Sequence, residues 1–83
     1  MAIEVLYFAR VREAIGKDRE AVDAHVSSID HLLGQLVARG GGYAGALADR
    51  SRLRFAINQR MAAAGDAITD GDEVAIFPPV TGG

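Results

Sequence analysis

The chain contains no cysteine among its 83 residues. This absence excludes disulfide bonds, thiolate metal ligands and a cysteine nucleophile. The two histidines, His25 and His31, are too few for a metal cluster without help from carboxylates. We therefore predict no metal site and no bound cofactor.

The sequence also lacks long apolar runs and any excess of positive charge. No segment approaches the length of a membrane span, and the N-terminus lacks the basic, apolar and small-residue pattern of a secretory signal. We therefore expect a soluble, cytoplasmic protein that does not bind membranes. The net charge of −2 argues against a nucleic-acid partner, because binding phosphates requires a cationic face. Eighty-three residues allow one domain with a modest core.

The main helix is predicted from residue 28 to about residue 39. Ser28 can cap the first turn, and Asp30 suits the positive end of the helix dipole. The apolar residues then recur at helical spacing, which gives one stripe: Ile29, Leu32, Leu33, Leu36 and Val37. The triple glycine at 40–42 ends this helix, and residues 43–47 are expected to form a short further turn.

Strands are predicted on both sides of this helix. We expect a central strand over 3–8, a loop or single helical turn over 9–16, an edge strand over 18–25, a strand over 53–57 and a last strand over 72–77, preceded by a tight turn at Asp70-Gly71. This order predicts an α+β fold in which a small mixed sheet packs on one main helix. A β-grasp, or ubiquitin-like, topology fits, with the last strand beside the first. The domain would span residues 1–77.

A tail over residues 78–83 follows the last strand directly. Pro78-Pro79 cannot continue sheet pairing and directs the chain away from the domain. Val80, Thr81, Gly82 and Gly83 add at most about 14 Å of reach. Because the last two residues have no side chains, they can thread a narrow channel and let a partner approach the terminal carboxylate.

Three other features allow competing interpretations. Phe8 and Phe77 are predicted on the open face of the sheet, with Met61 near them, and an exposed apolar cluster of this kind marks a partner site unless a loop covers it. The arginines could form a basic face or simply be solvated: Arg10, Arg12, Arg50, Arg52, Arg54 and Arg60. The run over 40–45 matches G-x-G-x-x-G in letters, but a helix precedes it, so we interpret it as a flexible loop.

The segment from Thr69 to Gly83 resembles the C-terminal signature of the small-subunit family of molybdopterin synthase, the MoaD family of ubiquitin-like sulfur carriers. The opening segment over 8–13 and the pair Asn58-Gln59 are similar to other parts of that family. The resemblance implies that an activating enzyme related to ubiquitin-activating enzymes uses ATP to adenylate Gly83. A sulfur donor protein would then convert it to a thiocarboxylate, without any cysteine in this chain.

The same resemblance implies a larger synthase subunit as the main partner, in a complex of two copies of each. The thiocarboxylate would give its sulfur to cyclic pyranopterin monophosphate, and the catalytic side chains would come from the partners. Three alternatives stay open: a sulfur carrier of the thiamine pathway, a ubiquitin-like protein modifier, and an interaction module with an inert tail. The segment over 77–81 favours the molybdenum pathway over the thiamine pathway, and a single lysine, Lys17, disfavours chains built on the protein itself.

Overall fold

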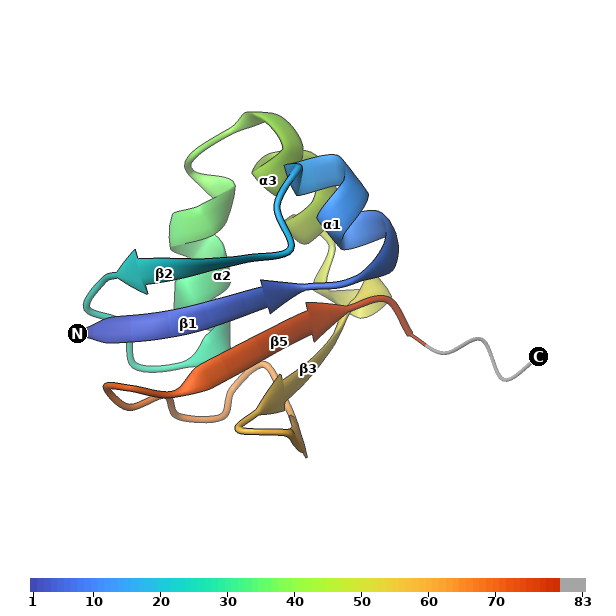
Figure 1. Ribbon diagram of the computed structural model, residues 1–83. Helices are drawn as coiled ribbons and strands as arrows, with labels where there is room; N and C mark the ends of the chain where they lie inside the picture. The colour runs from blue at the N-terminus through green and yellow to red at the C-terminus, as the bar shows by residue number, and fades with distance from the viewer. Residues whose placement is uncertain (80–83) are drawn as a thin grey trace.

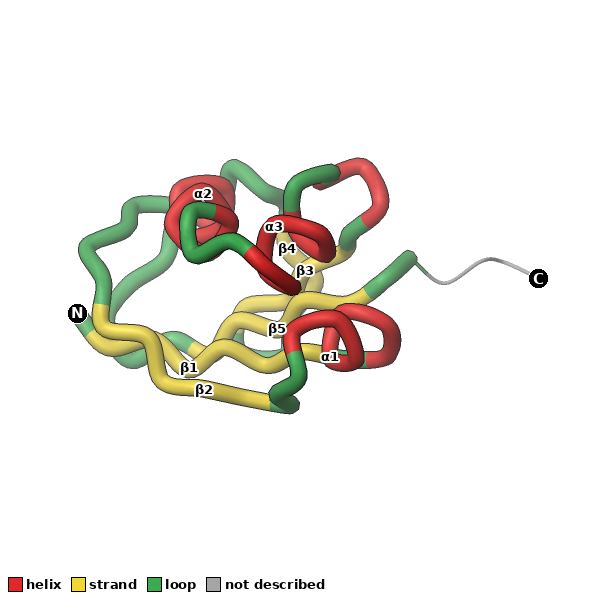
Figure 2. Tube along the Cα trace, turned by 90° about the horizontal axis from the view of Figure 1, so that it is seen from above, coloured by secondary structure: helices red, strands yellow, loops and turns green. Residues whose placement is uncertain are grey.

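The computed structural model describes residues 1–79, in which a five-stranded mixed sheet carries helices on one side (Figure 1). The strands are β1 (Ala2–Tyr7), β2 (Arg19–Asp23), β3 (Arg54–Ile57), β4 (Arg60–Ala62) and β5 (Glu73–Phe77). The helices are α1 (Ala9–Ile15), α2 (Ile29–Val37), α3 (Gly41–Leu47) and a short 3-10 helix, η1 (Arg50–Arg52). Figure 2 shows α2 and α3 on one side of the sheet and α1 at the end of β1.

The strand order is β2-β1-β5-β3-β4, so the last strand lies in the middle of the sheet beside the first. β1 and β5 run parallel, and the other neighbours are antiparallel. The predicted arrangement, with the first and last strands adjacent and an edge strand after the first turn, is therefore confirmed. Antiparallel strands can be joined by a short turn. The parallel strands β1 and β5 need a long crossover connection, which here comprises all the elements between residues 7 and 73.

The core forms where the helical stripe meets one face of the two central strands. Val5 pairs with Val74 and Tyr7 with Ile76, and all four side chains are buried. The stripe on α2 packs into the same cluster: Ile29, Leu32, Leu33 and Leu36 are buried and Val37 is half-buried. Ser28 caps α2 as predicted, because its Oγ accepts a hydrogen bond from the His31 backbone N–H at 3.1 Å.

The segment after the first strand differs from the prediction. The strand ends at Tyr7, and Phe8 is the N-cap residue of α1, a seven-residue helix rather than a loop or single turn. Gly16 ends this helix in the left-handed conformation, with φ of 85°, and its N–H donates to the Arg12 carbonyl. The helix was hard to detect because Val11 is its only fully buried residue.

The triple glycine does more than end α2. Gly41 and Gly42 form the first turn of α3, so the interpretation of residues 40–45 as a flexible loop is wrong. A Cβ on Gly42 would lie 1.9 Å from the Ala14 carbonyl oxygen, so only glycine lets α3 approach α1 this closely.

A short strand, β4, was not predicted. Asn58 and Gln59 both have positive φ, 50° and 69°, and form the two-residue turn that folds β4 back on β3. The Asn58 side chain also bridges to the start of β5, since its Nδ2 donates to Asp72 and its Oδ1 accepts from the Glu73 N–H, each at 2.9 Å. The predicted turn at Asp70-Gly71 is confirmed, with φ of 87° at Gly71.

The described residues contain no helix with the length and apolar character needed to cross a membrane. Pro78 and Pro79 carry no regular secondary structure and are half-buried. The predicted division into a domain over 1–77 and a tail over 78–83 stays a prediction.

The burial of the helical stripe makes a quantitative prediction. Truncating Leu33 or Leu36 to alanine should lower the free energy of unfolding by about 2–5 kcal/mol, because each side chain is at most 1% exposed. Denaturant unfolding measures this loss. The matched control is Gln35→Ala on the exposed side of the same helix, where we expect a change within about 0.5 kcal/mol. Equal midpoints for the leucine and glutamine variants would contradict the packing described above.

Candidate functional site

The candidate site is the end of β5, where the chain leaves the middle of the sheet. β5 ends at Phe77 and continues directly into Pro78 and Pro79. The Phe8 N–H donates to the Ile76 carbonyl at 3.2 Å, so the end of β1 holds the base of the tail on one side. In Figure 1, β5 ends on the same side of the molecule as α1 and the segment before β3. The tail is thereby attached to the most firmly paired part of the sheet.

Two aromatic rings stand at this base. The rings of Phe8 and Phe77 meet edge to face, with centroids 6.5 Å apart at 83°. Phe8 keeps 45% of its surface exposed, and Phe77 is half-buried. The expectation that both lie at an uncovered surface therefore agrees with their positions. We refer to these two residues as the aromatic pair.

Met61 lies on the same face of the sheet as Phe77. It is opposite Ala56 on β3, Ala56 is opposite Ala75 on β5, and Ala75 is opposite Leu6 on β1. Side chains at directly opposite positions share a face, so these residues form an apolar row across the sheet that ends at Met61, which is 69% exposed. Phe77 follows Ala75 two residues later and extends the row toward the tail.

Sequence reasoning missed most of this row. Leu6, Ala56 and Ala75 are inconspicuous in the sequence, and only the register of four strands brings them into line with Met61. The alternation within the first strand was the one available signal, because Leu6 and Phe8 are two residues apart.

The six arginines considered for a basic face do not form one surface. Arg50 binds Asp30 across to α2, with Nε and Oδ1 2.6 Å apart, and Arg60 lies on β4 opposite Ile57, at the end of the sheet away from the tail. Asp70 and Asp72, which might have suggested a cation site, accept hydrogen bonds from the backbone N–H groups of Ala2 and Thr69. In residues 1–79 no three histidine, cysteine or carboxylate side chains are grouped as metal ligands would be. His25 and His31 are both exposed.

The predicted site residues in the rest of the tail are Val80, Thr81, Gly82 and Gly83. They lie outside the described residues.

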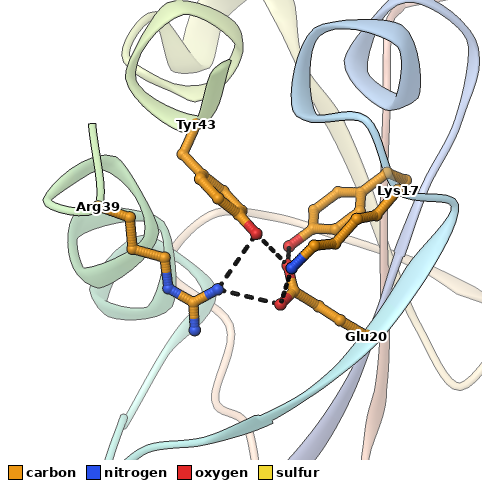
Figure 3. A network of polar contacts seen from close by, with 5 residues as sticks. Lys17, Glu20, Arg39 and Tyr43 are labelled. Atoms are coloured by element: carbon orange, nitrogen blue, oxygen red, sulfur yellow. Dashed lines mark hydrogen bonds and ion pairs between the residues drawn. The ribbon is translucent and has the colours of Figure 1, made fainter. Parts of the chain in front are cut away.

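The most connected polar group in the described part of the chain is Glu20 on β2 (Figure 3). Its carboxylate accepts hydrogen bonds from the Tyr7 and Tyr43 hydroxyls at 2.8 and 2.7 Å, and ion pairs reach it from Arg39 at 3.0 Å and Lys17 at 3.3 Å. Burial raises the pKa of Glu20, but these four donors together outweigh burial and lower the pKa from 4.5 to about 2. Burial, followed by the hydrogen bond to Glu20, raises the pKa of Tyr7.

All the partners of Glu20 come from within the domain, so this cluster is a structural link. It joins β1 and β2 to Arg39, which follows α2, and to Tyr43 on α3, where the Arg39 guanidinium also stacks 5.1 Å from the centre of the Tyr43 ring. None of the contacts of Glu20 involves β5.

The fold and the position of the tail define a ubiquitin-like β-grasp protein whose chain end emerges from the central strand. The sequence profile of the ThiS family matches residues 5–83, so the chain belongs to the ThiS family. The molybdopterin synthase sulfur carrier subunit of Escherichia coli K12 is 44% identical over 81 residues, which cover 98% of this chain and 99% of the relative. The predicted resemblance to the small subunits of molybdopterin synthase is confirmed.

Solved structures support the fold assignment. SAMP1 from Haloferax volcanii is 31% identical and has a TM-score of 0.75, with all of both chains covered. A complex of subunits 1 and 2 of the molybdopterin-converting factor from Helicobacter pylori contains a chain that is 23% identical, again with full coverage and a TM-score of 0.68. At 23% identity, the similarity to the Helicobacter pylori chain supports the fold only.

The Glu20 cluster makes a prediction about acid stability. Because the pKa of Glu20 is lower in the folded chain, its stabilising effect is complete above about pH 4.5 and is lost as the pH falls to about 2. Glu20→Gln should lower the free energy of unfolding at pH 7 by up to about 3 kcal/mol and flatten its dependence on pH in this window. Urea unfolding at several pH values measures both effects.

The control is Asp23→Asn on the same strand, where the carboxylate is 92% exposed and little stability should be lost. If Glu20→Gln and the native chain lost stability with equal steepness between pH 4.5 and 2, Glu20 would not be the acid-sensitive group.

Proposed function

We propose that this chain is a sulfur carrier of molybdenum cofactor biosynthesis. The observation that carries the proposal is the position of the tail, which leaves the central strand beside the exposed aromatic pair and continues through two prolines. Membership of the ThiS family and the 44% identity to a curated sulfur carrier subunit support it. The domain would hold the tail at a fixed place while partners act on its end.

The proposed cycle begins at the carboxylate of Gly83. A ubiquitin-activating-like enzyme would use ATP to form an acyl adenylate and release pyrophosphate. A donor protein would then deliver sulfur at the oxidation level of sulfide, which attacks the acyl carbon, displaces AMP and leaves a terminal thiocarboxylate. The absence of cysteine is consistent with this route, because the sulfur is carried on the backbone terminus.

The second half of the cycle would take place in the large synthase subunit. The tail would enter its active site, where the thiocarboxylate sulfur bonds to cyclic pyranopterin monophosphate. Water would then cleave the bond between that sulfur and the acyl carbon, which leaves the sulfur on the pterin and a carboxylate on Gly83. We assign no catalytic side chain to this chain. Pro78 and Pro79 limit the conformations of the tail base, which reduces the entropy lost on insertion.

The aromatic pair and Met61 are the proposed contact surface for the large subunit, in a complex with two copies of each. Exposed apolar side chains at the base of the tail would be buried when the tail is inserted. The Helicobacter pylori neighbour is itself recorded as a complex of two subunits, which is consistent with such an assembly.

Two alternatives share the fold and the chain end: a sulfur carrier of the thiamine pathway and a protein modifier. For the modifier, chains linked through Lys17 are disfavoured, since its amine donates to Glu20 at 3.3 Å. Intact mass after incubation with an activating enzyme, ATP and a sulfur donor separates the classes. Thiocarboxylate on this chain supports a carrier, whereas a mass shift on other proteins supports a modifier.

The partner surface predicts the effect of a charge at Phe77. Phe77→Asp should weaken binding of the large subunit by on the order of 100-fold, because a carboxylate would be buried in an apolar contact. Calorimetry measures the affinity, and circular dichroism tests the fold. The control is His25→Asp in an exposed loop beyond β2. Equal affinities for the two variants would remove Phe77 from the interface.

The chain end predicts the sharpest loss of function. Deleting Gly83 draws the carboxylate back by about 3.6 Å, and even a misplacement of about 1 Å can cost on the order of 100-fold in rate. Adenylation and sulfur transfer should both collapse, while melting temperature stays near that of the native chain. An in vitro synthase assay measures activity. Lys17→Arg, which keeps the charge beside Glu20, should remain active. A folded chain without Gly83 that still supports molybdopterin formation would show that the proposed function is wrong.

A further inference from the structure

A groove of about 450 Å³ lies between α1, α3 and η1, close to the base of the tail. Val11, Ala14 and Leu53 supply apolar surface, and Arg10 and Arg52 supply charge. Gly45 leaves bare backbone at the groove, because a Cβ built there meets no atom within 4 Å. The groove therefore has space for a side chain from another molecule, and none of the proposed steps of sulfur transfer uses it.

Three arginines border the groove and the tail base. Arg10 Nη2 reaches the Arg52 carbonyl at 3.4 Å, which brings α1 and η1 together, and Arg54 is the cross-strand neighbour of Phe77. We call Arg10, Arg52 and Arg54 the arginine collar. Arg54 likewise donates to a carbonyl, that of Leu53, at 2.9 Å. These bonds to carbonyls orient the guanidiniums of Arg10 and Arg54 without neutralising them.

The collar carries net positive charge within the described part of the chain. Lys17, Arg19, Arg39 and Arg50 all form ion pairs with carboxylates, whereas no carboxylate of residues 1–79 lies within 4.0 Å of a collar guanidinium. Asp49 also lines the groove, but its Oδ1 is bound to the Ser51 N–H and hydroxyl, at 3.1 and 2.5 Å. One carboxylate does not balance three arginines.

Four carboxylates lie at the opposite end of the sheet. Asp70, Asp72 and Glu73 lie at the start of β5, and Asp23 lies at the far end of β2. Glu13 on α1 and Asp49 at the groove also lie near the tail, but the three arginines of the collar outnumber them, so this end of a chain with a net charge of −2 has an excess of positive charge. This separation would orient the molecule tail first toward an acidic surface.

We propose that the arginine collar docks on carboxylates of the activating enzyme that flank its adenylation channel, while the groove takes an apolar side chain from the same surface. This inference rests on the proposed function. The collar is continuous with the aromatic pair through Arg54 and Phe77, so one partner can cover both. Exposed charges mainly accelerate association and contribute less to residence time. Such a contact suits a carrier that must leave its activator to reach the next partner.

Carrier-dependent exchange of pyrophosphate into ATP, catalysed by the purified activating enzyme, tests the inference. The variants are Arg10→Glu combined with Arg52→Glu, Arg54→Glu alone, and Gly45→Leu, which fills the groove without changing charge. The control is Arg60→Glu, the same charge change at the end of the sheet away from the tail. Circular dichroism shows whether each variant is folded.

At low salt we expect kcat/KM for the carrier to fall on the order of 100-fold in the double variant and tenfold in Arg54→Glu, with kcat within about twofold. Gly45→Leu should raise KM several-fold. The difference in kcat/KM between the native chain and the charge variants should shrink as the salt concentration rises. Arg60→Glu should have the same kcat/KM as the native chain.

Three results would overturn the role of the collar while leaving the proposed function intact. If the native chain supports exchange and the collar variants match it, or lower kcat instead of kcat/KM, the collar does not dock on the activating enzyme. Faster exchange by the variants would mean that the collar holds the chain's own terminal carboxylate. If the native chain supports no exchange of pyrophosphate into ATP, the proposed function is wrong, and the proposed role of the collar is wrong as well.

Discussion

The parallel pairing of β1 with β5 is the contact on which the rest of this molecule depends. It places Val5 beside Val74 and Tyr7 beside Ile76, at the bottom of the core. It also requires the last strand to insert between β1 and β3, so β5 lies at the centre of the sheet. An edge strand can fray, whereas Pro78 and Pro79 follow a strand whose backbone is hydrogen-bonded on both sides.

The two faces of the central strands differ in what covers them. One face is closed by α2 and tied to Arg39 after α2 and to Tyr43 on α3 through the half-buried Glu20 carboxylate (Figure 3). The other face keeps an apolar row and the aromatic pair uncovered. Because strand residues alternate between faces, neighbouring residues of β5 lie on opposite faces: Ile76 is buried in the core, and Phe77 is half-buried on the other face.

Local signals predicted the elements whose sequence pattern coincides with their burial. The α2 stripe, its Ser28 cap and the turn at Asp70-Gly71 were all readable, because each depends on residues a few positions apart. The signals failed where packing with distant residues decides the structure. The helix α1 has a single buried residue, and the start of α3 depends on the fit of Gly42 against Ala14.

The sequence by itself determined the chemistry available to this protein: no thiol, one lysine, and a chain end of two prolines followed by a terminal pair of glycines. It also indicated that Phe8, Met61 and Phe77 could be exposed. Only the tertiary structure decided their setting. The strand register aligns Met61 with Ala56 and Ala75, and the packing of the helices forms the groove. Both depend on contacts between residues far apart in the chain, so neither could be predicted from local sequence patterns. Spacing along a sequence specifies faces of single elements, and the positions of those faces relative to one another are fixed only when the core closes.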